Sequence, residues 1–500
     1  MKKIIIIGAG MAGLSTGIHA QANGYDTEIF EMHDLPGGLC TSWKRGAYLI
    51  DGCIHWLCGS SGKGLLGKYL DELGLLTNRK FLGREEITRI EVGPENDRRW
   101  FIAYTDRERF NRHLKELSPE DTEEIDRFTA LMEKFVSFPS ATDKPRELWG
   151  VGDYLSMIKT MKPFMKEFRE YGSLTVGEYA KRFSGVHVRE GIRNILDMPD
   201  FSFFALLMML AWHSTDNAGY PLGGSLAVSK SLEDTYRSMG GTIRYNARVE
   251  KILVEKKRAV GIRLSDGSEY RGDEVISCAD GATTIYKMLD GRFTSCTLDR
   301  LYRDLPLFTP LLYVSLGINR NLGTEPEMAV HYLDKPVTLE GRTQTGIGIK
   351  HYGRDPAMAP KGKALVEIMY PSNYEYWKTL SADRDRYAAE KKKAADTVIG
   401  ALEQIYPGIS KDIEMTDVAT PLTWERYTGN RNGTFEGWFI NPKTMMITIP
   451  KTLPGLKNFW MAGQWVQPGG GIVTCIKSGR DIVYRLCAAD RKPYSPPKRA

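Results

Sequence analysis

The hydrophobic pattern at the start of the chain predicts a strand–helix–strand unit. Residues 4–7 are four consecutive isoleucines, and such a β-branched run is typical of a central parallel strand buried on both faces. Residues 14–23 have helical composition and precede Gly24, a residue type that often ends helices. Residues 27–31 are again strand-like. We therefore predict a βαβ unit of about 30 residues.

The later pattern predicts further elements of both kinds. Residues 66–210 look mostly helical, with a helix beginning at Ser118-Pro119 and another over 157–171. Residues 242–275 alternate like strands, with Asp266-Gly267 as a hairpin turn. A strand at 311–317, a long helix at 387–406, a short strand at 459–462 and a closing helix at 472–486 complete the pattern. We expect the basic, proline-rich tail from residue 491 to be flexible.

Length and charge narrow the class of protein. A chain of 500 residues is too long for one compact core and predicts two or three lobes. Its hydrophobic content of 42% and charged content of 26% are ordinary for a globular protein. A net charge of +6 is too small for a nucleic-acid binder with a dense basic stripe. The same charge is compatible with weak attraction to an anionic membrane surface.

The cysteines and the longest apolar runs indicate a cytoplasmic protein. There are seven cysteines without a Cys-x-x-Cys pair, which argues against a disulfide framework, a zinc site and a redox dithiol. We therefore expect no bound metal. The isoleucine run is too short for a secretory signal, and no stretch reaches the roughly 18 apolar residues of a membrane span.

The first chemical motif is Gly8-x-Gly10-x-x-Gly13, which lies between the first strand and the first helix. Gly8 permits a tight turn, Gly10 lets a pyrophosphate approach the backbone, and Gly13 lets the helix pack close to the strand. Glu31 ends the second strand, where its carboxylate can bind an adenosine ribose and would repel a 2′-phosphate. The motif predicts an adenine dinucleotide other than NADP, and by itself does not separate FAD from NAD.

A second glycine pair, Gly37-Gly38, follows closely behind Glu31. In an NAD dehydrogenase a third βαβ crossover would usually continue here. A glycine loop at this place is better suited to pass beneath an extended flavin cofactor. This feature favours FAD.

In these motifs the chain resembles the phytoene desaturase, carotenoid isomerase and retinol saturase group of flavoproteins. The resemblance rests on residues 4–13, the Gly37-Gly38 loop and Asp51-Gly52-x-x-His55, and is supported by residues 219–225, 240–252 and 459–472. It implies that the backbone of Val249 meets the adenine end of FAD. It also implies that residues 463–472 cross the flavin ring, where a helix N-terminus would stabilise negative charge on the reduced flavin. The residues expected to bind FAD are Gly8, Gly10, Met11, Ala12, Gly13, Glu31, Gly37, Gly38, Leu39, His55, Val249, Gly463, Gln464, Gly471 and Ile472.

The chain departs from the family pattern at Leu39, where members often have an arginine. Lys44 or Arg45 is a candidate replacement for that cation. There is one dinucleotide fingerprint, so we expect no separate nicotinamide domain. The electron donor or acceptor stays open.

Few side chains stand out as catalytic, because a flavin carries out hydride transfer itself. His55 lies in a motif expected near the flavin, as a catalytic or a hydrogen-bonded structural residue. Glu425, between Trp424 and Tyr427, is a candidate acid or base. A role for His213 at the substrate site is a weaker hypothesis.

Two segments could contact lipid. The apolar run 201–212 is either a core helix or a tunnel wall or membrane-facing lid for a lipid substrate. Lys159, Lys162 and Lys166 lie beside methionine and phenylalanine residues. A solvated helix face is the preferred interpretation of these lysines, and a basic face that docks on lipid is the alternative.

We predict an α/β fold with a discontinuous glutathione-reductase-like Rossmann FAD domain and an α+β substrate domain, which combines a mixed sheet and a helical lobe. The FAD domain is assigned to residues 1–65, 215–290 and 455–490, and the substrate domain to 66–214 and 291–454. The hypothesised activity is desaturation, saturation or FAD-assisted isomerisation of a carotenoid, retinoid, other isoprenoid or lipid. The alternatives are a flavin amine oxidase and a non-enzymatic FAD-binding protein.

Overall fold

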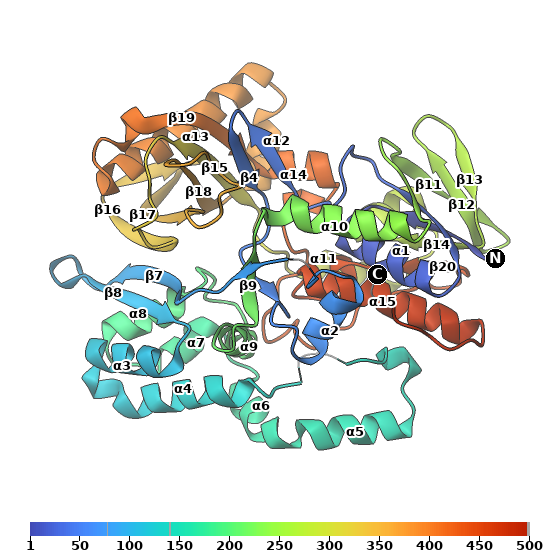
Figure 1. Cartoon of the computed structure of the whole chain (residues 1–500), viewed down its shortest axis with the longest axis horizontal. Helices are drawn as coiled ribbons and strands as arrows, with labels where there is room; N and C mark the ends of the chain where they lie inside the picture. The colour runs from blue at the N-terminus through green and yellow to red at the C-terminus, as the bar shows by residue number, and fades with distance from the viewer. Residues whose placement is uncertain (78, 140–141, 498–500) are drawn as a thin grey trace.

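The computed structural model describes residues 1–77, 79–139 and 142–497, which are arranged around two large sheets (Figure 1). The sheet at the right of Figure 1 contains the N-terminal strand and packs against the last helix. The sheet at the upper left is covered by a long helix, and a group of helices lies below it. The predicted division into more than one lobe is visible in this view.

The first sheet is parallel and takes its strands from distant parts of the chain. Its order is β10 (Thr242–Arg244), β2 (Asp26–Phe30), β1 (Lys3–Ile7), β14 (Glu274–Ser277) and β20 (Phe459–Met461). Each neighbouring pair runs parallel. Helix α1 (Met11–Ala22) connects β1 to β2, which confirms the predicted βαβ unit.

The four isoleucines of β1 are buried because both faces of this sheet are covered. Ile4 and Ile6 pack against α1, α10 (Gly224–Ser238) and α15 (Ile472–Ala489). Ile5 and Ile7 point the other way and pack against an antiparallel sheet. That sheet consists of β11 (Val249–Glu255), β12 (Arg258–Leu264) and β13 (Glu269–Arg271). Since side chains alternate along a strand, a run without polar residues requires two apolar layers.

The predicted turn at Asp266-Gly267 lies between β12 and β13, as expected. The turn between β11 and β12 was not predicted. It consists of Lys256 and Lys257, which both have positive φ, at 46° and 61°. Lysine rarely adopts this conformation, so the sequence contains no turn signal there.

The second sheet is mixed and seven-stranded. Its order is β19 (Ile413–Ala419), β15 (Leu311–Ile318), β18 (Ala364–Pro371), β17 (Arg342–His351), β16 (Met328–Leu339), β7 (Glu86–Val92) and β8 (Arg99–Tyr104). Its neighbours are antiparallel except for the parallel pair β16 and β7. Helix α13 (Arg384–Ile405) packs on this sheet through an apolar cluster.

Residues 66–210 are mostly helical, as predicted, but strands β7 and β8 interrupt them and were not predicted. They join the second sheet through Ala329 and Val330 of β16, which pair with Arg89 and Ile90 of β7. This contact spans about half of the chain. Local periodicity does not reveal a pairing between such distant segments.

The helical lobe below the second sheet contains α3 (Arg107–Leu117), α4 (Thr122–Phe135), α7 (Val176–Ala180), α8 (Val186–Asn194) and α9 (Phe203–His213). An aromatic cluster fixes α9 in place. The ring of Phe203 stacks on that of Tyr179 at 3.7 Å, and Phe204 meets Phe135 edge-on at 4.6 Å. Within the described residues, no helix is both long and apolar enough to cross a membrane.

The single helix predicted over 157–171 is wrong. It is divided into α5 (Val151–Met161) and α6 (Met165–Tyr171) by a short 3₁₀ turn that contains Pro163. Proline lacks the N–H that would continue the α-helical hydrogen bonds. Helix α5 therefore projects away from the body of the molecule (Figure 1).

The tail is also more ordered than expected over residues 491–497. The Tyr494 ring stacks on Tyr484 at 4.6 Å, and its hydroxyl lies 2.9 Å from Nδ1 of His19. The Ser495 N–H donates to Asn23 Oδ1. These contacts attach the tail to α1 and α15. Residues 498–500 lie outside the described residues.

Candidate active site

The glycine fingerprint forms the turn between β1 and α1. Gly8 has φ +96°, in the region that favours glycine. A Cβ on Gly13 would lie 1.9 Å from the Gly8 carbonyl oxygen, so the close approach of helix and strand requires glycine there. A Cβ on Gly10 would meet nothing closer than 3.8 Å. The protein itself therefore leaves room at Gly10, as a pyrophosphate site requires.

Glu31 lies beside this turn and is held by the backbone. The Ala9 N–H donates to its Oε2 at 2.7 Å, and the His33 N–H donates to its Oε1 at 2.9 Å. Burial raises the pKa of this carboxyl, although the two N–H groups oppose the shift. The carboxyl is thus oriented before a ligand binds. Each oxygen retains a lone pair that can accept from a ribose hydroxyl.

The second glycine pair lies against the fingerprint. The Gly37 N–H donates to the Ala9 carbonyl at 2.8 Å, and both Gly37 and Gly38 have positive φ. The hypothesis that Lys44 or Arg45 replaces the family's arginine is wrong. Arg45 is exposed and pairs with Asp417, and neither basic residue lines the cavity described below. Their strand β3 (Ser42–Arg45) pairs with the largely buried β4 (Tyr48–Asp51), and both basic residues lie at its exposed end, next to the turn between the two strands.

The last predicted cofactor segment connects β20 to α15. The Gly463 N–H donates to Ser478 Oγ at 2.7 Å, which fixes the start of the crossing. Gly471 precedes α15 without a side-chain cap, so the first N–H groups of this helix lack a capping partner from that residue. An uncapped helix N-terminus is suited to bind negative charge.

These segments surround one large cavity of about 1930 Å³. Ordinary ligand pockets measure about 300–1,000 Å³, so this cavity has room for an extended dinucleotide and a second molecule. The predicted cofactor residues that line it are Gly8, Gly10, Met11, Ala12, Glu31, Gly37, Gly38, Leu39, His55, Val249, Gly463, Gln464, Gly471 and Ile472. Gly13 lies behind this wall, where it supports Gly8.

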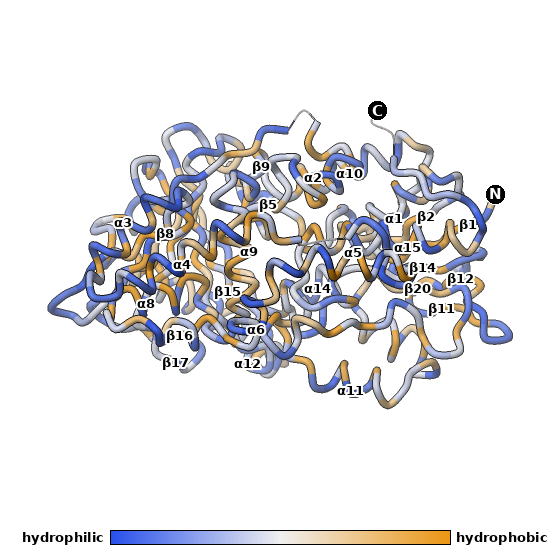
Figure 2. Tube along the Cα trace, turned by 90° about the horizontal axis from the view of Figure 1, so that it is seen from below, coloured by the Kyte–Doolittle hydropathy of each residue, from blue (hydrophilic) through white to orange (hydrophobic). Residues whose placement is uncertain are grey.

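The cavity continues beyond the glycine turns into an apolar chamber. One wall of the chamber is α9, through Ala205, Met208, Met209 and Trp212. Further wall residues are Ile87, Ile90, Met328 and Val330 from β7 and β16. Phe203 and Phe204 belong to the core, as the first interpretation of the apolar run predicted, whereas Met208 and Met209 line the chamber. The lipid substrate of the second interpretation stays a prediction. Figure 2 shows the hydrophobic course of α9.

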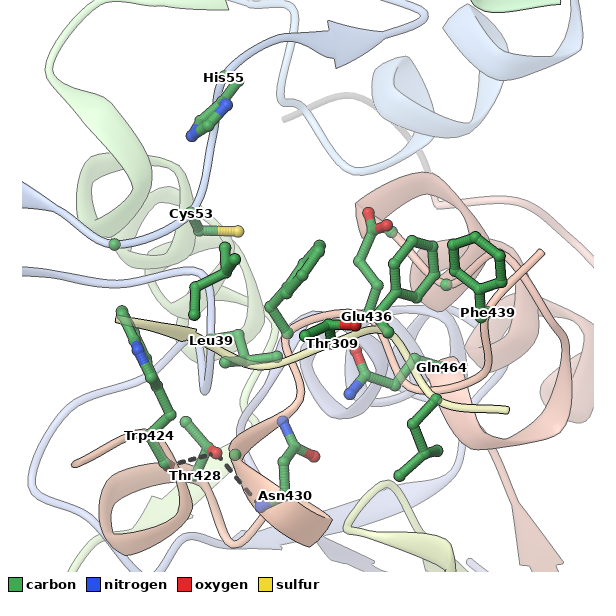
Figure 3. A pocket seen from close by; sticks show the side chains of 18 of the residues that line it. Leu39, Cys53, His55, Thr309, Trp424, Thr428, Asn430, Glu436, Phe439 and Gln464 are labelled. Atoms are coloured by element: carbon green, nitrogen blue, oxygen red, sulfur yellow. Dashed lines mark hydrogen bonds between the residues drawn. The ribbon is translucent and has the colours of Figure 1, made fainter. Parts of the chain in front are cut away.

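His55 points into the cavity near Cys53 (Figure 3). Burial lowers the pKa of its ring well below the ordinary value, and the charges of Lys350 and Arg84 add to this shift. The imidazole is therefore neutral at physiological pH and can donate or accept a hydrogen bond. This state is compatible with either of the two roles predicted for it.

The other two candidates differ in their position. Glu425, on α14 (Pro421–Thr428), lines the cavity and accepts a hydrogen bond from the Tyr374 hydroxyl at 2.7 Å. His213 is buried against the edge of Trp56 at 5.4 Å, and burial lowers its pKa to about 3. It is not among the residues that line the cavity.

Sequence reasoning missed a buried cluster of charged residues beside His55. Lys350 Nζ donates to the Tyr352 hydroxyl at 2.6 Å, which donates to Glu367 Oε2 at 2.7 Å. The Asp51 N–H donates to the other oxygen of Glu367 at 3.2 Å. Burial lowers the pKa of Lys350 to about 8 and raises that of Glu367 to about 7. Lys350 lines the cavity, but in the sequence it is an ordinary strand position without a motif.

Glu436 was also missed. It lines the cavity next to Gly471 and Gln464, and its carboxyl points into the open space in Figure 3. The sequence signal was the pair Glu436-Gly437 itself.

Comparisons with known proteins agree with this geometry. Residues 11–487 match the family described as flavin containing amine oxidoreductase. Prolycopene isomerase 1, chloroplastic, from an Oncidium hybrid cultivar is 24% identical, over 97% of this chain and 83% of that protein. The neurosporene-forming phytoene desaturase of Rhodobacter capsulatus is 23% identical, over 99% of this chain and 96% of that protein.

A solved structure supports the fold. Putrescine oxidase bound to putrescine superimposes with a TM-score of 0.61 at 12% identity, over 97% of this chain and 99% of that one. At this identity the likeness shows the fold alone, and it confirms the predicted α/β class. The glycine turns, Glu31 and the helix N-terminus of α15 fit FAD, which is the cofactor of this oxidoreductase. The chain belongs to the family of flavin containing amine oxidoreductases.

Proposed function

We propose that the protein changes the saturation or the geometry of a carbon–carbon double bond in a long apolar substrate, of the carotenoid, retinoid, isoprenoid or lipid class. The observation that carries this proposal is the continuity of the cavity. One space extends from the glycine turns and Glu31, which we call the dinucleotide cradle, to the apolar chamber under α9. The similarity to a prolycopene isomerase and a phytoene desaturase supports the same substrate class.

We propose that the cofactor residues predicted from the sequence hold FAD in this cavity. Gly8, Gly10 and the N-terminus of α1 would bind the pyrophosphate, Glu31 the ribose, and the N-terminus of α15 the flavin ring. When bound, FAD supplies hydride exchange with a substrate carbon. The walls of the chamber would orient the substrate. They would also exclude water from it. The FAD domain boundaries at 1–65, 215–290 and 455–490 belong to the same proposal.

Two other functions have to be separated from this one. A flavin amine oxidase is suggested by the description of the matched family and predicts turnover of amines with peroxide production. A non-enzymatic FAD-binding protein predicts a flavin that neither lipid nor amine can cycle. Saturation and desaturation both need a partner that supplies or removes electrons. A redox-neutral isomerase needs reduced FAD but no net electron transfer.

One experiment tests these functions together. The protein is purified and loaded with FAD, and its oxidised and anaerobically reduced forms are incubated with polyenes of several lengths and with amines. With polyenes we expect either products altered by two hydrogens, together with a change of the 450 nm flavin band, or isomerised products without a net change of that band. Amines should give neither result. Flavin cycling with amines alone would contradict the proposal, as would a chain that cannot bind FAD.

We further propose that α5 docks the protein on an anionic membrane from the cytoplasmic side, in the manner of a peripheral protein. No residue of α5 is buried. Val151, Leu155 and Ile158 are 78%, 62% and 66% exposed, and their spacing places them on one face of the helix. In Figure 2, which looks from the side of α5, hydrophobic and hydrophilic positions alternate along it.

Charge supports an anionic lipid surface as the occupant of this face. Lys159, Lys162 and Lys166 are exposed, whereas Asp153 is neutralised by an ion pair with Lys144 at 2.7 Å. Each lysine near an anionic bilayer contributes about 1 kcal/mol of attraction. All seven cysteines are free thiols, which supports the cytoplasmic location.

Vesicle sedimentation tests this docking. We expect co-sedimentation with vesicles that contain phosphatidylglycerol, and weaker binding to pure phosphatidylcholine. The variant L155D/I158D should lose vesicle binding but keep its FAD, because neither side chain contacts the core. The control K392D places the same new charge on the exposed face of α13 and should bind like wild type. Equal binding of wild type and L155D/I158D would contradict the proposal.

A further inference from the structure

Glu436 is a carboxyl group inside the cavity that has no polar partner. Across residues 1–77, 79–139 and 142–497, no hydrogen bond or ion pair reaches its side chain. The two acidic side chains of the cavity that the sequence singled out differ in this respect. Glu31 is bonded to two N–H groups, and Glu425 is bonded to Tyr374. The side chain of Glu436 is half-buried and lines the cavity, so its unpartnered carboxyl is available to a molecule bound there.

The backbone around Glu436 is fixed even though its side chain is free. The Phe308 N–H donates to the Gly437 carbonyl, and Trp438 Nε1 donates to the Trp465 carbonyl at 3.1 Å. A Cβ on Gly470 would lie 2.2 Å from the Glu436 carbonyl oxygen, so the glycine turn before α15 packs directly on this residue. Glu436 is therefore attached to the turn that leads into the proposed flavin-binding helix.

The carboxyl faces both parts of the cavity. Its Oε1 lies 3.5 Å from the position of a Cβ on Gly471, the residue that precedes α15. In the other direction it affects Cys53, Cys58, Cys475 and Tyr313, whose pKa values are raised by several causes, including its charge. In Figure 3 the side chains of Glu436 and Cys53 both point into the space above Leu39 and Gln464.

The surroundings of Glu436 shift its pKa toward neutral pH. Burial raises the pKa of Glu436 to about 7, and no basic side chain opposes the shift. The titratable groups that face it are thiols and a phenol with raised pKa values, so none of them carries a compensating positive charge. A carboxyl in this state can both give and take a proton at physiological pH.

We propose that Glu436 is the group that exchanges a proton with the substrate carbon next to the one that exchanges hydride with the flavin. This inference rests on the proposed function. In saturation, the π bond of the substrate breaks and two C–H bonds form. One uses a hydride drawn from the reduced flavin, which is thereby oxidised, and the other uses the carboxyl proton of Glu436, which is left as carboxylate. Desaturation is the reverse. In isomerisation, Glu436 adds a proton and removes it again after bond rotation.

The test compares three FAD-loaded variants with the wild type: E436Q, E436D and E425Q. For E436Q we expect a loss of turnover of about 100-fold or more, in the range typical of a missing general acid. E436D should recover part of the rate. E425Q should keep more activity than E436Q, because Glu425 already has a partner in Tyr374. Each variant is first checked for FAD content and melting temperature.

Two readouts do not depend on the rate. For an isomerised product formed in D₂O, the wild type should exchange one carbon-bound hydrogen for deuterium, and this labelling should be absent with E436Q. A saturated product does not discriminate, because the N5 hydrogen of reduced flavin also exchanges with solvent. Infrared difference spectra between wild type and E436Q should show a carboxylic acid C=O band that titrates near pH 7. A wild type that turns over no polyene overturns the proposed function itself. A wild type that does so, with unchanged rate and labelling in E436Q, overturns only the role of Glu436.

Discussion

The two ends of the cavity are built in different ways. The cradle consists mainly of backbone: glycine turns, helix N-termini and N–H groups that orient one carboxylate, Glu31. The other end consists of side chains, with the Lys350 and Glu367 cluster, Glu436 and the methionines of α9. The cradle therefore tolerates few changes of shape, whereas the other end is sensitive to changes of charge and volume. This difference predicts distinct failures for mutations at the two ends.

The largest effect is expected at the buried charges. Lys350→Met leaves Glu367 and Asp51 without their cation, and removal of one partner of a buried ion pair costs about 3–5 kcal/mol. We expect the urea midpoint of unfolding to fall accordingly, and the double variant K350M/E367Q to recover part of the loss. A change below about 1 kcal/mol would show that this cluster behaves like surface charges.

The next effect is a dependence of stability on pH. Burial raises the pKa values of Glu367 and Glu436 to about 7. The native state thus keeps protons between pH 5 and 7 that the unfolded chain releases, so stability should fall as pH rises through this window. One pKa unit corresponds to about 1.4 kcal/mol, so Glu436 accounts for at most about 3.5 kcal/mol.

Melting temperatures of wild type and E436Q from pH 5 to 8 measure this contribution. The curve of E436Q should be flatter over the window. Lys350 affects stability at higher pH, because burial lowers its pKa to about 8 in the native state. From about pH 8 toward pH 10 the unfolded chain binds a proton that the native state does not, so stability should rise with pH there. Parallel curves for the two proteins would mean that Glu436 titrates normally.

At the cradle we expect loss of cofactor together with a moderate loss of stability. Gly13→Ala places a methyl group 1.9 Å from the Gly8 oxygen, and relief of such overpacking costs about 1–3 kcal/mol. The purified variant should retain less than about a tenth of its FAD by 450 nm absorbance, since a shift of about 1.4 kcal/mol in binding changes affinity tenfold.

The matched control for this prediction is Gly400→Ala in α13. A Cβ there meets nothing within 4 Å, and alanine favours a helix by about 1 kcal/mol. This control should bind FAD normally and be as stable as wild type or more so. Normal FAD content in the Gly13 variant would mean that the strand and the helix can separate without harm to the site.

The smallest effect is expected from filling the chamber. Ala205→Phe places an aromatic ring in the wall next to Met209. KM for a long polyene should rise about tenfold, which corresponds to about 1.4 kcal/mol, while FAD content stays unchanged. A short substrate should be affected less. Equal effects on long and short substrates would mean that the chamber does not hold the end of the chain.

The sequence by itself determined the cradle and the fold class. A run of isoleucines, three spaced glycines and an acidic strand end are local signals, because a strand, a turn and a helix that follow one another need only neighbouring residues. The prediction of FAD rests on such signals and is confirmed. The crossing before α15 was implied by the resemblance to the flavoprotein group and stays a prediction.

The tertiary structure alone decided how the second sheet is assembled and which charged side chains meet in the cavity. Strand β7 pairs with a segment about 240 residues away, and Lys350, Glu367, Asp51 and Glu436 come from four separate segments. Arg45, a reasonable candidate in the sequence, is directed to the surface by its hairpin. Burial turns ordinary lysine and glutamate residues into groups that titrate near neutral pH, and burial depends on which distant segments pack together.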